Sequence, residues 1–397
     1  MGLRILQICP KPPLPLIDGG CIAMNALTQG LTNAGHEVQV VAIVTSKHPH
    51  IPEAFSSEYF ENHMYSHVHI QTELNPIRAL SCLLKSKNYN LDRFYSSKFN
   101  QKLIDILSTS DFDVVILDSL YSSPYLSTVR KCSNAKVVYR AHNVECEIWD
   151  GLAEKSSNPL KSWYLRSLSK SLEIEEVSII NDVDAIATIT NEDEGWINQR
   201  TDTPTHNVPF GVDVETDIAV EFDGADHVFH FGSMDWEPNI EATRWLLEEV
   251  WPLVLEEYPE ARLVLAGRSM PYEFYSDVKS GVDVLGEVDS AVEFLKRPGI
   301  LTVPIQSGSG MRIKAVEGMA CGKPCVGTSL GLQGLGLSDG ENSMIANTPK
   351  AFANSLILLL KNEKLARKIA LNGATHIREK FSNENIIKEL SKFLENL

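Results

Sequence analysis

The chain has 397 residues, of which 43% are hydrophobic and 22% charged, and its formal net charge is -16 at pH 7. These values are typical of a globular protein that is too long for one hydrophobic core, so we expect two domains. The acidic balance excludes a general nucleic-acid binder, because phosphate recognition needs a basic face. The seven cysteines are scattered without a paired metal-ligand spacing, which favours reduced thiols and a cytoplasmic location.

The first half alternates short apolar runs with amphipathic stretches, a pattern typical of a parallel sheet covered by helices. We expect strands at residues 3–8, 38–43, 113–117, 136–140 and 185–190. We also expect helices at residues 22–33 and 160–182. The longer helix should bury Trp163, Leu165 and Leu168 on one side. No stretch approaches the roughly 18 apolar residues that span a bilayer, so we do not expect an integral membrane protein.

A second α/β series follows a segment rich in proline and glycine at residues 207–213. Its expected strands are residues 228–231, 262–266, 282–285, 301–304 and 324–327, and its expected helices are 239–257, 312–321, 349–361 and the tail 364–396. In open parallel sheets, ligands bind at the carboxyl ends of the strands. The predicted fold class is therefore α/β, with two Rossmann-like domains facing a central cleft.

The predicted domain boundaries follow from this alternation. We place an N-terminal domain at residues 1–207, a linker at 208–215, a C-terminal domain at 216–375, and a last helix at 376–397. That helix is expected to pack back on the N-terminal domain.

Residues 304–324 carry the strongest indication of chemistry. A strand leads into a glycine-rich turn and the start of a helix, formed by Gly308, Ser309, Gly310 and Met311. Glycine lets the backbone approach an anion closely, and the free amides at a helix start face it. Arg312 and Lys314 lie in the first turn, where the helix dipole disfavours cations unless an anion is bound nearby. The pattern favours a phosphate site over a plain strand-to-helix turn.

Glu317 follows on the same helix, and two interpretations of it remain open from the residues alone. Its carboxylate is placed to accept hydrogen bonds from a ribose diol. Alternatively, it is a surface residue that pairs with Lys314 three positions earlier.

Residues 317–324, which read Glu-Gly-Met-Ala-Cys-Gly-Lys-Pro, resemble the donor-binding motif of the retaining GT-B glycosyltransferases of family four, the group 1 type. Further matches occur, in order, at residues 19–20, 35–38, 142–145, 231–239, 265–268, 285–288 and 327–335. The resemblance covers nearly the whole chain. It implies two Rossmann-like domains and the transfer of a sugar from a nucleotide diphosphate.

The resemblance also implies which residues do this work. The donor would be held by Gly19, Gly20, Gly232, Ser233, Arg268, Gly286, Val288, Gly308, Ser309, Gly310, Met311 and Glu317. Arg312 and Lys314 would stabilise the leaving phosphate. His142 would hydrogen-bond a sugar hydroxyl or orient the acceptor. The sequence departs from the family pattern at two places. Ser309 replaces the usual glutamate that contacts the donor sugar, which leaves the identity of the sugar open. Residues 234–237 lack the phosphate-binding arginine that many members have there, so its role would fall to Arg268, Arg312 or Lys314 and to backbone amides.

The implied reaction is retaining transfer from a UDP- or GDP-type donor to a glycan, lipid-linked or small-molecule acceptor, without a metal or other cofactor. Asp111 and Asp113 have an Asp-x-Asp spacing but precede a strand, and we interpret them as the end of a loop. A nucleotide-sugar epimerase and a non-catalytic sugar-nucleotide binding protein remain as alternatives, the second because of Ser309.

Residues 75–102 hold six basic residues against one acid, with leucines and aromatic residues between them. Such a patch can rest on anionic lipid or bind an anionic acceptor. A solvated helical hairpin is the other interpretation. The expected location is cytoplasmic, with peripheral contact at the inner face of a membrane as an option.

Overall fold

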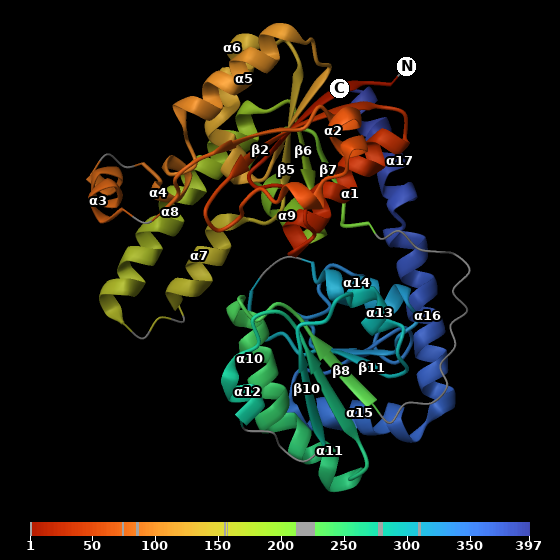
Figure 1. Cartoon of the computed structure of the whole chain (residues 1–397). Helices are drawn as coiled ribbons and strands as arrows, with labels where there is room; N and C mark the ends of the chain where they lie inside the picture. The colour runs from red at the N-terminus through yellow and green to blue at the C-terminus, as the bar shows by residue number, and fades with distance from the viewer. Residues whose placement is uncertain are drawn as a thin grey trace. The chain divides into compact units, whose positions relative to one another are not determined.

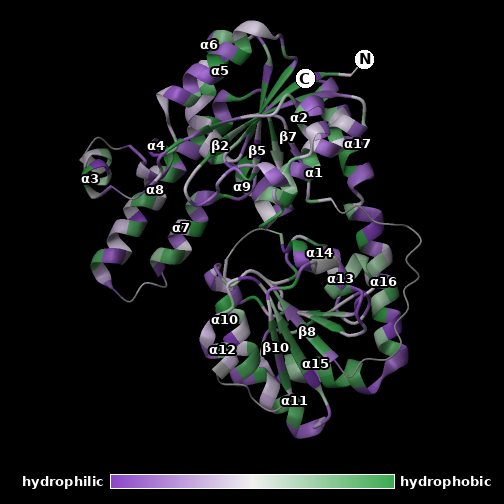
Figure 2. Cartoon of the chain, viewed as in Figure 1, coloured by the Kyte–Doolittle hydropathy of each residue, from purple (hydrophilic) through white to green (hydrophobic). Residues whose placement is uncertain are grey.

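The computed structural model describes residues 2–73, 75–84, 87–154, 156, 158–211, 227–276, 281–308 and 311–397. The chain divides into two compact units (Figure 1). Unit 1 comprises Met1–Gly211 together with Asn383–Leu397, and unit 2 comprises Val212–Ser382. Each unit has its own parallel sheet, and the strands of both are largely hydrophobic, whereas the outer helices carry many hydrophilic residues (Figure 2).

Unit 1 contains a seven-stranded parallel sheet in the order β3-β2-β1-β4-β5-β6-β7. The strands are β1 (Arg4–Cys9), β2 (Glu37–Val44), β3 (Ser66–His69), β4 (Val114–Asp118), β5 (Lys136–Ala141), β6 (Ala185–Thr188) and β7 (Thr205–Asn207). The five strands predicted in this half are confirmed. The outer strands β3 and β7 were not predicted, because their half-buried residues form no continuous apolar run.

The helices of unit 1 cover both faces of this sheet. They are α1 (Gly19–Asn33), α2 (Ser57–His63), α3 (Pro76–Leu84), α4 (Tyr89–Asp92), α5 (Ser97–Thr109), α6 (Leu126–Cys132), α7 (Glu145–Glu154), α8 (Pro159–Asp182), α9 (Asn191–Asn198) and α17 (Asn383–Glu395). Short 3-10 segments lie at η1 (Pro52–Ala54) and η2 (Leu120–Tyr125). Helix α1 begins before the predicted residue 22 because Asp18 accepts a hydrogen bond from the N–H of Cys21.

The long helix α8 matches the predicted range, but one of its predicted core residues is wrong. Leu165 and Leu168 are buried, whereas Trp163 is 63% exposed. The buried side of α8 runs through Leu165, Leu168 and Leu172. A residue two positions before Leu165 points away from that side in a helix.

The last helix closes one face of the unit 1 sheet. Leu390 and Ile387 of α17 join the core cluster that contains Met24 and Leu27 of α1. Gly30 makes this contact possible, since a Cβ on it would lie 2.4 Å from Cγ1 of Ile387. The C-terminal segment therefore belongs to the N-terminal fold.

Unit 2 contains a six-stranded parallel sheet in the order β10-β9-β8-β11-β12-β13. The strands are β8 (His227–Phe231), β9 (Arg262–Ala266), β10 (Val282–Gly286), β11 (Ile300–Val303), β12 (Cys325–Gly327) and β13 (Met344–Ile345). The helices are α10 (Glu237–Trp245), α11 (Trp251–Glu257), α12 (Tyr272–Ser276), α13 (Ala291–Leu295), α14 (Ile313–Ala320), α15 (Pro349–Lys361) and α16 (Glu363–Phe381). All five predicted strands are present, and the two-residue β13 was too short to predict.

Two predicted helices are interrupted. The helix expected at 239–257 contains a π-helical turn, η3 (Leu246–Val250), between α10 and α11. The tail expected at 364–396 breaks at Ser382, and its two halves, α16 and α17, belong to different units. Unit 2 thus ends at Ser382 rather than at 375, and unit 1 extends to Gly211 rather than to 207. The predicted linker falls partly on residues 212–215, outside the described ranges.

Among the helices of the described ranges, none combines the length and the apolar character that a bilayer-spanning segment requires.

Candidate functional site

His142 lies directly after β5, at the carboxyl edge of the unit 1 sheet. Its Nε2 makes a short hydrogen bond with Oδ1 of Asp118, the last residue of β4. Asp118 is fully buried, and in the sheet it lies opposite Arg140 of β5. The pairing of two neighbouring parallel strands therefore brings the histidine and the carboxylate together.

The carboxylate of Asp118 is itself held from the other side. Its Oδ2 accepts a 2.7 Å hydrogen bond from Nε2 of Gln7, and Oε1 of Gln7 accepts one of 2.6 Å from the hydroxyl of Thr28. Burial raises the pKa of Asp118, but His142, Arg140 and Gln7 outweigh burial and hold it below its ordinary value. An ionised carboxylate only accepts hydrogen bonds, so the shared proton belongs to Nε2 of His142. Nδ1 is then the ring nitrogen left for a substrate.

Two carboxylates from other helices hold the loop that carries His142. Glu176 of α8 accepts hydrogen bonds from the N–H groups of Glu145 (2.8 Å) and Cys146 (2.9 Å). The N–H of Val144 also acts on Asp193 of α9, where it partly offsets the rise in pKa that burial causes at that carboxyl. The free amides at the start of α7 are thereby satisfied, in the position where the helix dipole favours negative charge.

Burial makes the carboxyl groups of Glu145 and Asp193 costly to ionise. Burial raises the pKa of Glu145 to about 7, and the neighbouring charge of Glu176 adds to the shift, although Tyr121 donates a hydrogen bond of 3.0 Å to Glu145. Burial also raises the pKa of Asp193 to about 6. These groups bind protons near neutral pH, where ordinary carboxyls are ionised.

Gly19 and Gly20 open helix α1, and the structure shows a local reason for the second glycine. Asp18 caps the helix and pairs with Lys11, whose Nζ lies 2.6 Å from Oδ1. A Cβ on Gly20 would lie 2.8 Å from that Nζ. Gly20 thus leaves room for the ion pair, and a donor-binding role for these glycines stays a prediction.

In unit 2, glycines bring the ends of three strands close together. The N–H of Gly232 donates to the carbonyl of Ala266, and the N–H of Gly267 donates to the carbonyl of Gly286 at 2.7 Å. A Cβ on Gly267 would lie 1.9 Å from the carbonyl oxygen of Gly232. Backbone approaches this close exclude side chains. The predicted Gly232 and Gly286 therefore lie at one carboxyl edge, with Val288 two residues beyond β10.

Lys314, in the first turn of α14, is the central cation at this edge. Its Nζ donates hydrogen bonds of 2.9 Å to the carbonyl of Phe231 and to Oδ1 of Asn239. Burial, followed by the charge of Arg312, lowers the pKa of Lys314 to about 7. Both acceptors are neutral, and no carboxylate in the described part of the chain forms an ion pair with Lys314. A partly buried ammonium group with neutral hydrogen-bond partners can receive an anion.

Arg312 lies next to it, at the N-cap of α14. Its Nη2 donates a 2.8 Å hydrogen bond to the carbonyl of Gly308, and its guanidinium carbon is 5.2 Å from the ring centroid of Trp236. Burial lowers the pKa of Arg312 to about 10. Gly308 has a φ of +89°, and a Cβ there would lie 3.0 Å from Trp236. Trp236 thus packs against both residues, whereas the predicted Ser309 and Gly310 lie outside the described ranges.

The remaining predicted donor residues differ in what they contact. Nη2 of Arg268 lies 3.2 Å from Oγ of Ser233 and 2.9 Å from Oδ2 of Asp235, so this arginine is engaged in an ion pair with the loop after β8. Glu317 is half-buried in the second turn of α14, and burial raises its pKa to about 7. Met311 is half-buried just before α14.

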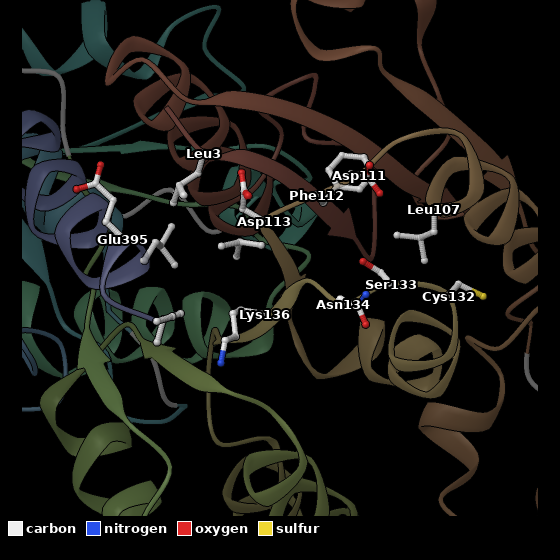
Figure 3. Close-up of a pocket in the computed structure, with 13 residues that line it drawn as sticks. Leu3, Leu107, Asp111, Phe112, Asp113, Cys132, Ser133, Asn134, Lys136 and Glu395 are labelled. Carbon is white, nitrogen blue, oxygen red and sulfur yellow. The ribbon is translucent and has the colours of Figure 1, made fainter. Parts of the chain in front are cut away.

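A pocket of about 470 Å³ opens at the other edge of the unit 1 sheet, where the strands begin (Figure 3). Asp111, Asp113, Lys136 and Glu395 line it. Oδ2 of Asp113 accepts a 2.7 Å hydrogen bond from the N–H of Arg4. The two aspartates end the loop before β4, as predicted, at the end of the strands opposite to His142. In the described ranges, no three His, Cys, Asp or Glu residues are grouped to hold a metal.

The predicted basic patch at residues 75–102 forms α3, α4 and the first part of α5. Part of its charge is neutralised internally, because Nε of Arg78 lies 2.6 Å from Oδ2 of Asp92. Lys85 lies outside the described residues.

Comparison with known proteins shows what unit 2 is similar to. Residues 225–362, which include Lys314, match the family described as glycosyl transferases group 1. The chain thus carries a group 1 glycosyltransferase domain and is a glycosyltransferase. The enzyme is also similar along its length to an uncharacterized 44.6 kDa protein in the cps region of Klebsiella pneumoniae. The two are 24% identical, over 98% of this chain and 99% of the relative.

Solved structures with the same GT-B fold align with this chain over nearly its whole length. Sucrose-phosphate synthase from Thermosynechococcus elongatus has a TM-score of 0.70 at 15% identity, covering 99% of this chain and 98% of its own. HepE of Anabaena in complex with UDP has a TM-score of 0.67 at 12% identity, covering 100% of both chains. HepE has also been solved with UDP-glucose. At these identities the likeness establishes the fold, and the α/β prediction of two Rossmann-like domains is confirmed.

Proposed function

We propose that the enzyme transfers a sugar from a nucleotide diphosphate to a glycan or lipid-linked acceptor, with retention of the anomeric configuration. The observation that carries the proposal is the state of Lys314, a partly buried ammonium group that has only neutral acceptors in the described structure. A diphosphate is a strong anionic partner for such a group. The complexes of HepE with UDP and UDP-glucose support UDP as the first donor to test.

In this proposal, unit 2 stabilises the leaving group. As the bond between the anomeric carbon and the phosphate oxygen breaks, negative charge grows on the diphosphate. Lys314, Arg312 and the amides at the start of α14 oppose that charge in a site of low dielectric. The carboxylate of Glu317, one turn further on, accepts hydrogen bonds from the ribose. Because these cations carry the charge stabilisation, no divalent metal is needed.

The acceptor hydroxyl attacks the same face of the sugar that the phosphate leaves. Its oxygen bonds to the anomeric carbon, and its proton passes to the departing phosphate oxygen, so that the products are the glycoside and the nucleoside diphosphate. His142 of unit 1 offers Nδ1 to a hydroxyl of the donor sugar or the acceptor. Asp118 fixes the ring in that orientation through Nε2.

The test is turnover of UDP- and GDP-sugars with a panel of glycan and lipid-linked acceptors, with and without EDTA. We expect nucleoside diphosphate to be released with one donor, without inhibition by EDTA, and NMR of the product to show the donor's anomeric configuration. Inversion in the product would overturn the retaining mechanism. Release of nucleoside diphosphate without any acceptor product would favour an epimerase, and tight donor binding without transfer or hydrolysis would favour a binding protein.

A further inference from the structure

Large apolar side chains that face solvent are concentrated on one helix of unit 1. In the described structure, five such side chains are more than 60% exposed, namely Ile77, Leu160, Trp163, Ile174 and Tyr272. Three of them belong to α8, the 24-residue helix that also contributes to the core. Isolated exposed apolar residues need no explanation, but a set on one helix does.

The three side chains share one side of α8. Steps of three, four, three and four residues along the helix lead from Leu160 to Trp163, Ser167, Lys170 and Ile174. Residues spaced in this way form a continuous stripe on a helix surface. Arg166 and Lys170 are both exposed, and Arg166 precedes the centre of the stripe by one residue. The stripe is therefore apolar with added positive charge.

The other sides of α8 already have partners within unit 1. Leu165, Leu168 and Leu172 are buried in the unit. Ser162 and Ser169 donate hydrogen bonds of 2.8 and 2.9 Å to carbonyls of α7. The exposed acids Glu147, Asp150 and Glu154 belong to α7, which contacts this second side of α8. The stripe therefore lies on the solvent-exposed side of α8, the helix labelled beside α7 in Figure 1.

We propose that the solvent-facing stripe of α8 docks on an anionic lipid bilayer. Lys161, Arg166 and Lys170 are exposed, and no described carboxylate forms an ion pair with them. Glu173, which precedes Ile174, already lies 3.5 Å from Arg200. Anionic headgroups supply the missing counter-charge, while the leucine, tryptophan and isoleucine enter the boundary between headgroups and acyl chains. The long basic side chains can lie along that boundary with their charges in water.

Two features favour a bilayer over a second copy of the chain. Pairing α8 with its own copy would place Arg166 and Lys170 against like charges, which is destabilising. Tryptophan is suited to the interface, because the indole ring is apolar but carries an N–H group for water or headgroups. Since the chain carries a net charge of -16, approach to an anionic surface requires a local basic face of this kind. The proposed surface therefore lies on α8 rather than on residues 75–102.

Co-sedimentation with vesicles tests the proposal on the full chain. We expect binding to vesicles of phosphatidylcholine mixed with phosphatidylglycerol, little binding to phosphatidylcholine alone, and loss of binding at high salt. The triple variant Leu160→Ser, Trp163→Ser, Ile174→Ser should reduce the partition coefficient about a hundredfold, because each side chain loses apolar area buried in the interface. The double variant Arg166→Gln, Lys170→Gln should reduce it about tenfold.

Matched controls lie in unit 2. Tyr272→Ser and Leu371→Ser remove exposed apolar side chains, and Lys364→Gln removes an exposed cation, so none of these should change vesicle binding. Equal binding by the wild type and the triple variant would overturn the proposal, as would equal binding to neutral and anionic vesicles. Self-association that the triple variant abolishes, without vesicle binding, would instead make α8 a contact between copies. The thermal shift caused by nucleotides should persist in the triple variant, which separates this result from the proposed reaction.

Discussion

In unit 1 the ring of His142 is fixed by Asp118, and Asp118 has Gln7 and Arg140 as further partners. In unit 2 Lys314 is held by a carbonyl and an amide oxygen, and its charge has no described counter-ion. The histidine is therefore oriented before any ligand arrives, whereas the ammonium group pays for burial until an anion binds. In the proposed reaction, unit 1 orients a substrate hydroxyl through His142, and unit 2 binds the charged diphosphate through Lys314.

The largest expected effect on activity comes from replacing Lys314. Lys314→Met should lower kcat/KM by about a thousandfold and abolish the thermal shift caused by UDP, because the leaving diphosphate loses its buried partner. The melting temperature without ligand should change little, since an uncompensated buried charge is removed along with its hydrogen bonds. Steady-state kinetics and differential scanning fluorimetry measure both.

Lys323→Met is the control, because Lys323 is a lysine with a buried side chain that follows the other end of α14. Its kcat/KM should remain that of the wild type. Full UDP binding by Lys314→Met would contradict the role of Lys314 as the anion receptor.

The next effect concerns the oriented histidine. Asp118→Asn should lower kcat by about a hundredfold while leaving the dissociation constant of UDP unchanged. Asparagine has one acceptor oxygen, for which Nε2 of His142 and Nε2 of Gln7 then compete, so the tautomer and orientation of the ring are no longer fixed. Asp113→Asn, at the opposite end of β4, should leave kcat unchanged. A loss of UDP affinity in Asp118→Asn would show that the two clusters do not divide the work as proposed.

A smaller effect is the pH dependence of donor binding. Lys314 is protonated below its pKa of about 7 and loses its charge above it. The affinity for UDP should therefore fall about fivefold between pH 7 and pH 8, where the terminal phosphate, with a pKa of about 6, is already ionised. Isothermal titration calorimetry measures this slope. Glu317, whose pKa is also about 7, titrates in the same pH range. The pH dependence of UDP binding should therefore be measured in the Glu317→Gln variant, which serves as the background.

The absence of a slope in that background would mean that Lys314 stays charged throughout. Lys314→Met in the same background should bind weakly at every pH.

The smallest effect is on the stability of unit 1. Burial raises the pKa of Glu145 from its ordinary value of 4.5 to about 7, so the folded state binds the extra proton. This contribution is fully present below pH 4.5 and is lost as the pH rises through 7. Relative to Glu145→Gln, the wild type should therefore lose about 2 kcal/mol of unfolding free energy between pH 5 and pH 8. Thermal unfolding at both pH values measures it.

Glu154→Gln, at the exposed end of α7, should follow the wild type. If Glu145→Gln shows the same pH dependence as the wild type, Glu145 ionises without cost in the folded state.

Several parts of the fold followed from short stretches of sequence. The apolar runs of β1, β4, β5, β8 and β11 predicted buried parallel strands, because such strands are hydrophobic on both faces. The glycine-rich turn before Arg312 predicted the start of α14. His142 was placed correctly at a strand's carboxyl end, since it directly follows the apolar run of β5.

The partners of these residues did not follow in the same way. Asp118 was missed, although its position after the run 113–117 put it at the same sheet edge as His142. Trp236 lies within the matching segment 231–239, but nothing in the neighbouring sequence indicated that it would pack against Arg312. Trp163 was expected in the core because it is aromatic, yet it is exposed, since the tertiary contacts of α8 selected the side with Leu165 and Leu168.

The sequence by itself determined where strands and helices form and which residues end them, because hydrophobic period, glycine and capping act over a few residues. Only the tertiary structure decided that α17 completes unit 1, that Asp118 holds His142, and that Lys314 is partly buried with neutral acceptors. Asp118 and His142 are 24 positions apart in the sequence, and Asn239 and Lys314 are 75 apart. His36 and Ser391, which join α17 to the rest of unit 1, are 355 apart. These contacts depend on strand order and packing, which a local pattern does not encode.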